Sequence, residues 1–367
     1  MKNILMITPN IPSFDTNAGD WRVFTLCKAL TRAYRVYLLP LSYSWNGGRH
    51  ERIVKNVGIR IVYPGINNAA RFERFLREKK IETMIFRSEY SMSGFEKYFR
   101  SVKNVVVDTH ELRYEKLERN ISLLSAEKRK GYIKRLQSFK EKELLNLERA
   151  DTLITVSDLD ANKLMKYFPG KKIITIHIPG DTPVKAFKYP DFGNRKGLVF
   201  FGNYGLLTPN DDAVRYFLKD IFPRVQKMLP GVTFTVLGYL AETYKDMWSD
   251  VLTKGHVHNI LEEISKYRVF VCPLRYGAGV KKKVIDALMS KTPVVATSVG
   301  FEGVEVMPGS DILVADDPQE FARCIADIYC NERKWSRIGL GGYRRAVKHY
   351  SQTAFEKQVE RFCKILA

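Results

Sequence analysis

Residues 271–303 read VCPLRYGAGVKKKVIDALMSKTPVVATSVGFEG, a succession of four segments with distinct patterns. An apolar run ends at Pro273, a Gly-x-Gly loop spans residues 277–279, an apolar stripe at helical spacing covers residues 280–290, and a second apolar run covers residues 293–297. Strand, loop, helix and strand in this order predict a βαβ unit, in which the two strands are parallel.

The same alternation of short apolar runs and helical stripes extends along the chain in both directions. It predicts an α/β fold with two doubly wound, Rossmann-like parallel-sheet domains. The other predicted strands cover residues 3–8, 36–41, 59–63, 83–86, 105–108, 152–156, 172–177, 197–201 and 233–237. The other predicted helices begin after Gly19 or cover residues 71–80, about 112–149, 158–167, 209–228 and 318–329.

A segment rich in Pro and Gly, residues 181–197, has no sustained period and predicts a linker. We therefore expect an N-terminal domain over residues 1–180 and a C-terminal domain over residues 198–350. Residues 351–367 contain a capping box, Thr353-x-x-Glu356, followed by an apolar stripe, which predicts a terminal helix.

The composition is that of a globular chain, because 45% of its 367 residues are hydrophobic and 27% are charged. The five cysteines form no C-x-x-C pair, which argues against a zinc knuckle or a disulfide framework and favours a reducing, cytoplasmic compartment. No stretch approaches 18 consecutive apolar residues, and the apolar run at the start is short. We therefore expect neither a membrane span nor a signal peptide.

The formal net charge is +20, and residues 1–185 alone carry 34 basic and 20 acidic side chains. Such a surplus attracts polyanions, namely nucleic acid, an anionic membrane surface or phosphorylated substrates. Lys281, Lys282 and Lys283 form a local cluster in the first turn of the helix predicted after the Gly-x-Gly loop. Because cations are unfavourable at a helix N-terminus and anions are favourable there, the cluster predicts a bound polyphosphate. A flexible loop with solvated lysines is the alternative.

From Gly277 onward, the sequence GAGVKKKVIDALMSKTPVVAT and then GFEGV resembles the donor-binding region of GT-B-fold glycosyltransferases, specifically the family 4 type of bacterial polysaccharide synthesis. The resemblance implies two Rossmann-like domains facing a cleft, with the C-terminal helix crossing back to the first domain. An ordinary terminal helix on the nearest domain is the alternative. Other segments agree in the same order, namely Asp151-x-x-Ile154-Thr155-Val156-Ser157, Phe200-Phe201-Gly202, Pro209-Asn210-Asp211-Asp212-Ala213 and Val236-Leu237-Gly238.

The resemblance also implies an activity: a retaining, metal-independent transferase that moves a sugar from a nucleotide diphosphate to a glycan or lipid-linked acceptor. The donor is a substrate, so no cofactor is implied, and UDP is favoured over GDP. Gly279 and Val280 would supply amides to the pyrophosphate, and Asp286 would bind the ribose unless it is a plain solvent-facing residue. The implied donor site comprises Gly202, Asn203, Pro209, Asn210, Arg275, Gly277, Ala278, Gly279, Val280, Lys281, Lys283 and Asp286.

The chain departs from the family pattern in two places. Eight positions before Asp286, where the family has a glutamate, it has Ala278, which cannot bond a sugar hydroxyl, so the identity of the sugar stays open. The segment Gly202-Asn203-Tyr204-Gly205-Leu206 lacks the basic residues often found after the first strand of that domain. We expect the lysine cluster to supply this charge instead.

In the first domain, the predicted strand ending at Asp108 leads to His110 at the carboxyl edge of the sheet, where open α/β sheets bind ligands. His110 resembles the cleft histidine of the family, which implies a contact with the donor sugar; a strand-end histidine without a role fits the residues equally well. Gly19 offers a close backbone approach to the reacting atoms. Asp211 and Asp212 are interpreted as helix-capping charges, and no metal site is expected.

Residues 126–140, AEKRKGYIKRLQSFK, combine six basic side chains with apolar residues at helical spacing. The pattern suits a helix on an anionic membrane surface, which would make the protein peripheral on the inner face of the membrane. It suits equally a helix that packs on its own sheet with solvated lysines. The residues that would meet lipid or a lipid-linked acceptor are Lys128, Arg129, Lys130, Lys134 and Arg135.

Two other functions remain as alternatives. A nucleotide-sugar epimerase on the same fold would need added acid and base carboxylates, for which the sequence offers no convincing candidates. A non-catalytic nucleic-acid-binding protein would explain the charge, but it would need basic residues interleaved with aromatics on an exposed sheet, or a recognition helix. Neither pattern is found, so we expect no nucleic acid partner.

Overall fold

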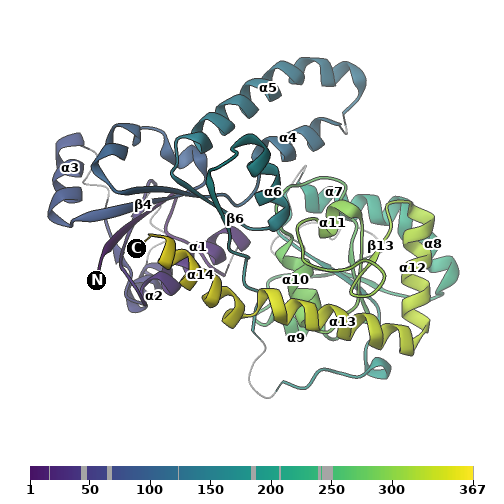
Figure 1. The fold of residues 1–367 in the computed structure, drawn as a ribbon. Helices are drawn as coiled ribbons and strands as arrows, with labels where there is room; N and C mark the ends of the chain where they lie inside the picture. Colours follow the sequence, from purple (N-terminus) through teal and green to yellow (C-terminus); the bar gives the residue numbers. More distant parts are fainter. Residues whose placement is uncertain are drawn as a thin grey trace. The chain divides into compact units, whose positions relative to one another are not determined.

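The chain forms two compact units, Met1–Ile178 with Phe355–Ala367, and Pro179–Ala354 (Figure 1). Each unit contains one parallel sheet, which confirms the two predicted Rossmann-like domains. The structure is a computed structural model that describes residues 1–15, 17–42, 48–63, 68–122, 124–182, 187–205, 208–238, 241 and 251–366.

The sheet of the first unit has seven strands in the order β3-β2-β1-β4-β5-β6-β7. Strands β2 and β3 lie on one side of β1, and β4 to β7 lie on the other. The direction in which successive strands are added therefore reverses between β1 and β4. The carboxyl ends of these two strands therefore border the crevice in which doubly wound sheets bind ligands. The strands are β1 Asn3–Thr8, β2 Arg35–Pro40, β3 Arg60–Ile61, β4 Ile81–Arg87, β5 Asn104–Asp108, β6 Thr152–Thr155 and β7 Lys172–Thr175.

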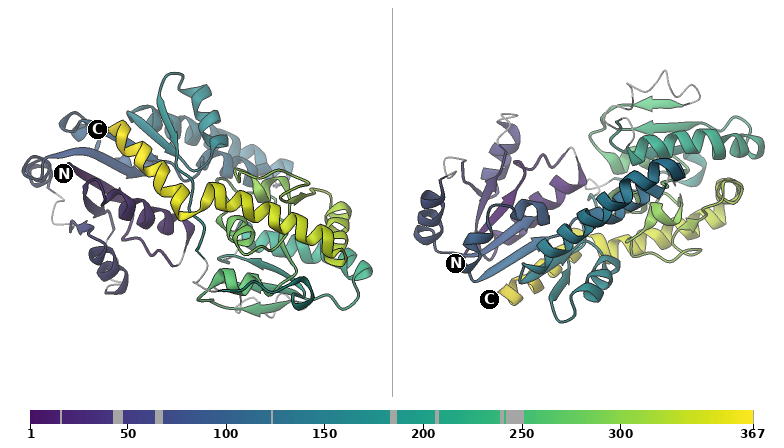
Figure 2. Two further views of the ribbon diagram at one scale, coloured as in Figure 1. Left: turned by 60° about the horizontal axis from the view of Figure 1, so that its bottom comes forward. Right: turned by 90° about the horizontal axis from the view of Figure 1, so that it is seen from above.

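Helices α1 and α14 pack together on one face of this sheet, as the two views of Figure 2 show. The apolar stripe of α1, with Leu26 and Leu30, lies in one buried cluster with Phe355 and Phe362 of α14. The terminal helix thus packs within the first unit. The helices of this unit are α1 Ala18–Leu30, α2 Arg49–Asn56, α3 Ala69–Glu78, α4 Arg113–Ser122, α5 Ala126–Glu148, α6 Asp158–Tyr167 and α14 Gln352–Leu366, with 3-10 turns at Glu89–Met92 and Glu96–Ser101.

The helix predicted over about 112–149 is two helices, α4 and α5, which extend beyond the sheet of their own unit (Figure 1). Ser125 stands at the N-cap of α5, a position that serine favours. Among the described residues, no helix combines the length and the apolar character that crossing a membrane requires.

The sheet of the second unit has six strands in the order β10-β9-β8-β11-β12-β13, and its order reverses between β8 and β11. The strands are β8 Leu198–Phe201, β9 Phe234–Leu237, β10 Leu252–Lys254, β11 Val269–Cys272, β12 Val294–Ala296 and β13 Leu313–Val314. The helices are α7 Pro209–Tyr216, α8 Phe222–Met228, α9 Ile260–Ile264, α10 Lys282–Met289, α11 Ser298–Phe301, α12 Pro318–Cys330 and α13 Glu332–Tyr350, with a π-turn at Phe217–Ile221 and a 3-10 turn at Phe192–Asn194.

The boundary between the units lies at Ile178/Pro179, so the predicted linker 181–197 is part of the second unit wherever the structure describes it. Arg195 is fully buried and donates from Nη1 to the hydroxyl of Thr292 at 2.9 Å. The Tyr189 hydroxyl donates to the carbonyl of Met289 at the end of α10. These two contacts tie the described part of this loop to the second unit.

Candidate functional site

The glycine-rich segments of the second unit meet at the point where the order of its strands reverses. Gly202 directly follows β8, and the loop Gly277–Gly279 follows β11, the neighbouring strand. Both therefore lie at the carboxyl edge of the sheet where this class of fold binds ligands. Gly277 has a φ of 137° and Gly279 a φ of 67°, values that side chains rarely tolerate.

The three lysines of the cluster leave the start of α10 in different directions. The Lys281 ammonium donates to the carbonyl of Gly279 at 2.6 Å. The Lys282 ammonium lies 2.7 Å from a carboxylate oxygen of Asp286 and 2.9 Å from one of Asp181. The cluster therefore divides into one lysine that is paired with carboxylates and two that face the glycine-rich edge, because successive helical positions differ by about 100°.

Lys283 points from α10 to the end of β8. Its ammonium donates to the side-chain carbonyl of Asn210 and lies 4.4 Å from the centre of the Phe200 ring. A Cβ atom on Gly202 would lie 2.5 Å from Nδ2 of Asn210 and 3.0 Å from Nζ of Lys283. Only a glycine leaves room for this contact, so Gly202, Asn210 and Lys283 form one packed group.

Burial is the main cause that lowers the pKa of Lys283 to about 8, and the nearby charge of Lys281 lowers it further. The Cys272 thiol acts in the opposite direction. An ammonium that is held among neutral groups in a low dielectric interacts strongly with any anion that reaches it. The site is thus built to receive negative charge.

Asp286 and Arg275 have other partners than the predicted donor. The Asp286 carboxylate is 1% exposed and accepts from Lys282 and from the backbone N–H of Asp181, and burial raises its pKa to about 6. It is therefore a buried partner of Lys282 and not an open ribose ligand. The Arg275 guanidinium makes two bonds to Asp212, which hold the loop before Gly277 against α7.

The remaining residues of the predicted donor site surround the glycine loop and the start of α7. Pro209 stands in the first turn of α7, where a missing N–H costs nothing, and Thr208 caps the helix. The carbonyl of Asn203 accepts from Asn210 at 2.7 Å. Ala278 is half-buried, and Val280 is buried below the loop.

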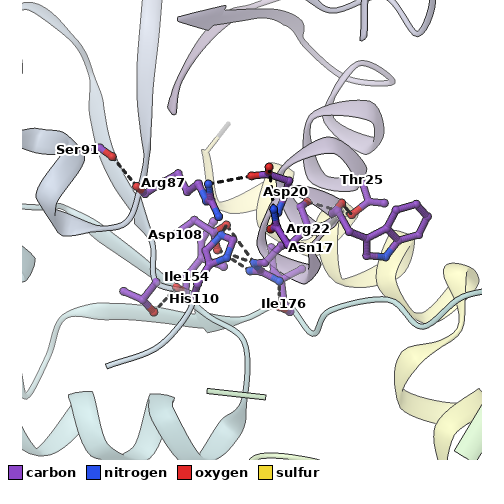
Figure 3. A network of polar contacts seen from close by, with 12 residues as sticks. Asn17, Asp20, Arg22, Thr25, Arg87, Ser91, Asp108, His110, Ile154 and Ile176 are labelled. Carbon is purple, nitrogen blue, oxygen red and sulfur yellow. Dashed lines mark hydrogen bonds and ion pairs between the residues drawn. The ribbon is translucent and has the colours of Figure 1, made fainter. Parts of the chain in front are cut away.

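In the first unit, Arg87 at the end of β4 points to the start of α1 (Figure 3). It lies there beside Gly19. A Cβ atom on Gly19 would lie 2.3 Å from Nη2 of Arg87, so the missing side chain lets the guanidinium lie against the first turn of α1. Nη1 of Arg87 donates to Asp20 at 3.0 Å. The close approach predicted at Gly19 is therefore made by Arg87 of the same unit.

Asp108 holds two basic side chains beside it (Figure 3). Arg22 of α1 donates from Nε to both carboxylate oxygens at 3.1 Å, and Nε2 of His110 lies 3.2 Å from Oδ2. Thr109 bonds the carbonyl of Ile154 on β6 through its N–H and its hydroxyl, which fixes the turn after β5.

The helix predicted to meet a membrane gives a mixed result. Arg129, Lys130, Lys134 and Arg135 are exposed on α5, whereas the side chain of Lys128 lies outside the described residues. Of the apolar residues interleaved with them, Tyr132 and Ile133 are exposed, while Leu136 and Phe139 are half-buried and Phe139 packs on the core of the first unit.

Comparison with known proteins finds a family model that matches part of the second unit. Residues 195–331 match the family model "Glycosyl transferases group 1". This segment is therefore similar to the group 1 glycosyl transferases. A relative from Klebsiella pneumoniae, "Uncharacterized 44.6 kDa protein in cps region", is 25% identical over 301 residues, which cover 78% of this chain and 75% of the relative.

The chain is also similar to solved structures of GT-B fold over its whole length. Sucrose-phosphate synthase from Thermosynechococcus elongatus aligns with a TM-score of 0.75 and 17% identity, covering 100% of this chain and 99% of that one. HepE of Anabaena in complex with UDP aligns with a TM-score of 0.73 and 12% identity, covering 100% of both chains. At these identities the likeness shows the fold, and the segment that resembles group 1 glycosyl transferases carries the glycine and lysine cluster described above.

Sequence reasoning missed two residues of the network in the first unit, Arg22 and Arg87. A sequence pattern could have indicated Arg22. Arg22 precedes Leu26 and Leu30 at intervals of four, so it lies on the apolar face of the helix, where a charge needs a buried partner. No sequence pattern indicates Arg87, because local periodicity does not encode the strand order that brings it beside Gly19.

Proposed function

We propose that this protein is a retaining, metal-independent glycosyltransferase of the family 4 type, which moves a sugar from a nucleotide diphosphate to a glycan or lipid-linked acceptor. The observation that carries the proposal is Lys283, half-buried at the strand-order reversal of the unit that resembles group 1 glycosyl transferases, and bonded to neutral Asn210 beside a glycine loop. The nucleoside diphosphate that leaves when the sugar is transferred supplies the negative charge that this site lacks. The structures of HepE with UDP and of an S. aureus TarM mutant with UDP support UDP as the nucleotide.

The proposed catalysis is positional and electrostatic. The first N–H groups of α10 and the ammonium groups of Lys281 and Lys283 stabilise the departing diphosphate, while the acceptor hydroxyl attacks from the face that the leaving group vacates. Since these cations take the place of a metal ion, we expect turnover to survive an excess of EDTA. Loss of turnover in EDTA, restored by added Mg²⁺, would refute this part.

A thermal-shift panel of nucleoside diphosphates and their sugars tests the donor. A ligand at 100 times its dissociation constant stabilises the folded protein by about 2.7 kcal/mol, so UDP should raise the melting temperature more than GDP. The K281A/K283A variant should lose this shift and bind UDP at least tenfold more weakly by calorimetry. The K219A/K227A variant removes two exposed lysines of the same unit and should bind normally. Equal UDP affinity in both variants contradicts the proposal.

His110 is proposed to contact the transferred sugar and not the nucleotide. It follows β5 at the carboxyl edge of the first sheet, next to the strands that border the crevice. An interaction that strengthens in the transition state appears in turnover, so H110A should lower kcat strongly and leave UDP affinity within about twofold. A parallel loss of both would place His110 at the nucleotide.

A cytoplasmic protein bound to the inner membrane face would explain the exposed part of α5. Tyr132 and Ile133 are exposed beside four exposed basic residues, and each basic residue near an anionic surface contributes on the order of 1 kcal/mol. Co-sedimentation with anionic vesicles should occur at low salt and vanish when Arg129, Lys130, Lys134 and Arg135 are neutralised together with Lys128. Equal binding to neutral vesicles, or none to anionic ones, argues against a membrane role.

A further inference from the structure

The imidazole of His110 has one nitrogen committed inside the protein. Nε2 is buried, makes no other contact with a hydrogen-bond partner in the described part of the chain, and lies 3.2 Å from Oδ2 of Asp108, close enough for an ion pair. Solvent reaches 13% of the side chain. Nδ1 is the ring nitrogen that remains to bond a ligand.

Asp108 is itself held from behind by Arg22. The guanidinium bonds both carboxylate oxygens, and its Nη1 donates to the carbonyl of Ile176 after β7 at 2.6 Å. Arg22 is 0% exposed and Asp108 is 1% exposed. The carboxylate is thus oriented by a rigid fork that ties α1, β5 and the segment after β7 together, and it cannot turn away from His110 without breaking the buried pair.

Every charged group that faces the imidazole acts on its protonation. Burial lowers the pKa of His110, the Asp108 carboxylate raises it, and the guanidinium groups of Arg22 and Arg87 lower it, with a net result below the ordinary value. The pKa of Asp108 is itself held well below its usual range by Arg22 and His110, against the effect of burial. At neutral pH the pair is therefore a carboxylate and a neutral imidazole.

We infer that Arg22 and Asp108 are positioning residues that keep the Nε2–H of His110 on Asp108, so that Nδ1 accepts a hydrogen bond from a substrate hydroxyl. A neutral imidazole has one donor and one acceptor nitrogen, and the partner of one decides the role of the other. The inference rests on the proposed function for the identity of the hydroxyl, which belongs to the sugar. It assigns to His110 the part of an acceptor, which a protonated histidine could not play.

Nitrogen-15 NMR of the full chain labelled in histidine tests the arrangement without any turnover. H110Q identifies the signal of His110 among the six histidines. The wild-type imidazole should titrate below the reference pKa of about 6.5 and show the Nε2–H tautomer. R22Q should raise the pKa of His110, since a positive neighbour is lost. D108N should lower that pKa and mix the tautomers, and R22K should restore wild-type behaviour.

The NMR test needs a control variant, and a second variant in case R22Q does not fold. D15N removes the carboxylate 2.6 Å from His50 and should leave the His110 signal unchanged. If R22Q does not fold, R22Q/D108N leaves no buried charge unpaired and should mix the tautomers as D108N does. A wild-type Nδ1–H tautomer, or a His110 that keeps its pKa and tautomer in D108N, overturns the inference.

The pH dependence of the transfer rate distinguishes a failure of this inference from a failure of the proposed function. The acid limb of kcat/KM for sugar transfer should move to higher pH in R22Q, because protonation of His110 removes the acceptor. Absence of transfer from every nucleotide sugar, with the NMR results as expected, would overturn the proposed function alone. Transfer whose acid limb is the same in R22Q and wild type would overturn the role assigned to Nδ1.

Discussion

In the first unit, the charged side chains Arg22, Asp108, Arg87 and Asp20 are paired with one another near the carboxyl edge of the sheet. In the second unit, Lys283 near the corresponding edge contacts neutral groups among the residues that the structure describes. Arg22 and Asp108 form a buried pair and Arg87 binds Asp20. Lys283 instead contacts the Asn210 amide and the Phe200 ring. Both edges lie where strand order reverses, so the topology is shared and the electrostatics differ.

The difference indicates what each edge is prepared to bind. A paired network is already satisfied, so it can orient a neutral hydroxyl but gains little from a bare anion. An unpaired cation in a low dielectric gains most from an anion. This division suits a donor diphosphate in the second unit and sugar hydroxyls in the first.

The largest effect, on the free energy of unfolding, is expected from breaking the buried Arg22–Asp108 pair. D108A leaves the Arg22 charge buried without a partner and should lower the free energy of unfolding by about 3–5 kcal/mol. D212A frees Arg275 from a pair whose side chains are 40% and 20% exposed, and should cost no more than about 1 kcal/mol. Urea denaturation measures both, and similar losses would show that the two edges do not differ as described.

A second contrast uses one substitution at two glycines. Gly238 has a φ of 121°, and its added Cβ would lie 2.1 Å from the backbone oxygen of Gly202, so G238A should cost about 1–3 kcal/mol and weaken UDP binding. G19A meets the ends of two side chains, Arg87 at 2.3 Å and Asn17 at 3.3 Å, which can move away at a cost of about 1 kcal/mol. Thermal melting and calorimetry with UDP compare them. A G19A variant less stable than G238A would contradict the expectation.

The smallest predicted effect is a pH dependence of donor binding. A diphosphate beside Lys283 raises its pKa above the free value of about 8, so binding takes up a proton once the pH exceeds that value. UDP affinity should fall by up to tenfold, about 1.4 kcal/mol, per pH unit above 8 and change little below it. Calorimetry in two buffers detects the proton, and K283M should abolish the dependence.

Sequence reasoning predicted the strands and helices more accurately than the contacts between side chains. The predicted strand after residue 81 and the helix from about 280 correspond to β4 and α10, yet the apolar pattern does not indicate the short strands β10 and β13 or helix α13. Three lysines in a row predicted a polyphosphate site, but Lys282 proved to neutralise Asp286. The Lys282–Asp286 pair has the i,i+4 spacing at which helical side chains meet, whereas no local pattern connects Lys282 to its second carboxylate, Asp181.

The sequence by itself determined the α/β class, the two parallel-sheet domains, the glycine loop before α10 and the resemblance to GT-B-fold glycosyltransferases, because each depends on residues close together in the chain. Only the tertiary structure decided that Arg22 binds Asp108, that Arg87 lies against Gly19 and that the segment after Ile178 belongs to the second unit. These contacts join residues separated by tens of positions, and strand order in a sheet, which brings them together, is set by packing of the whole unit and not by local periodicity.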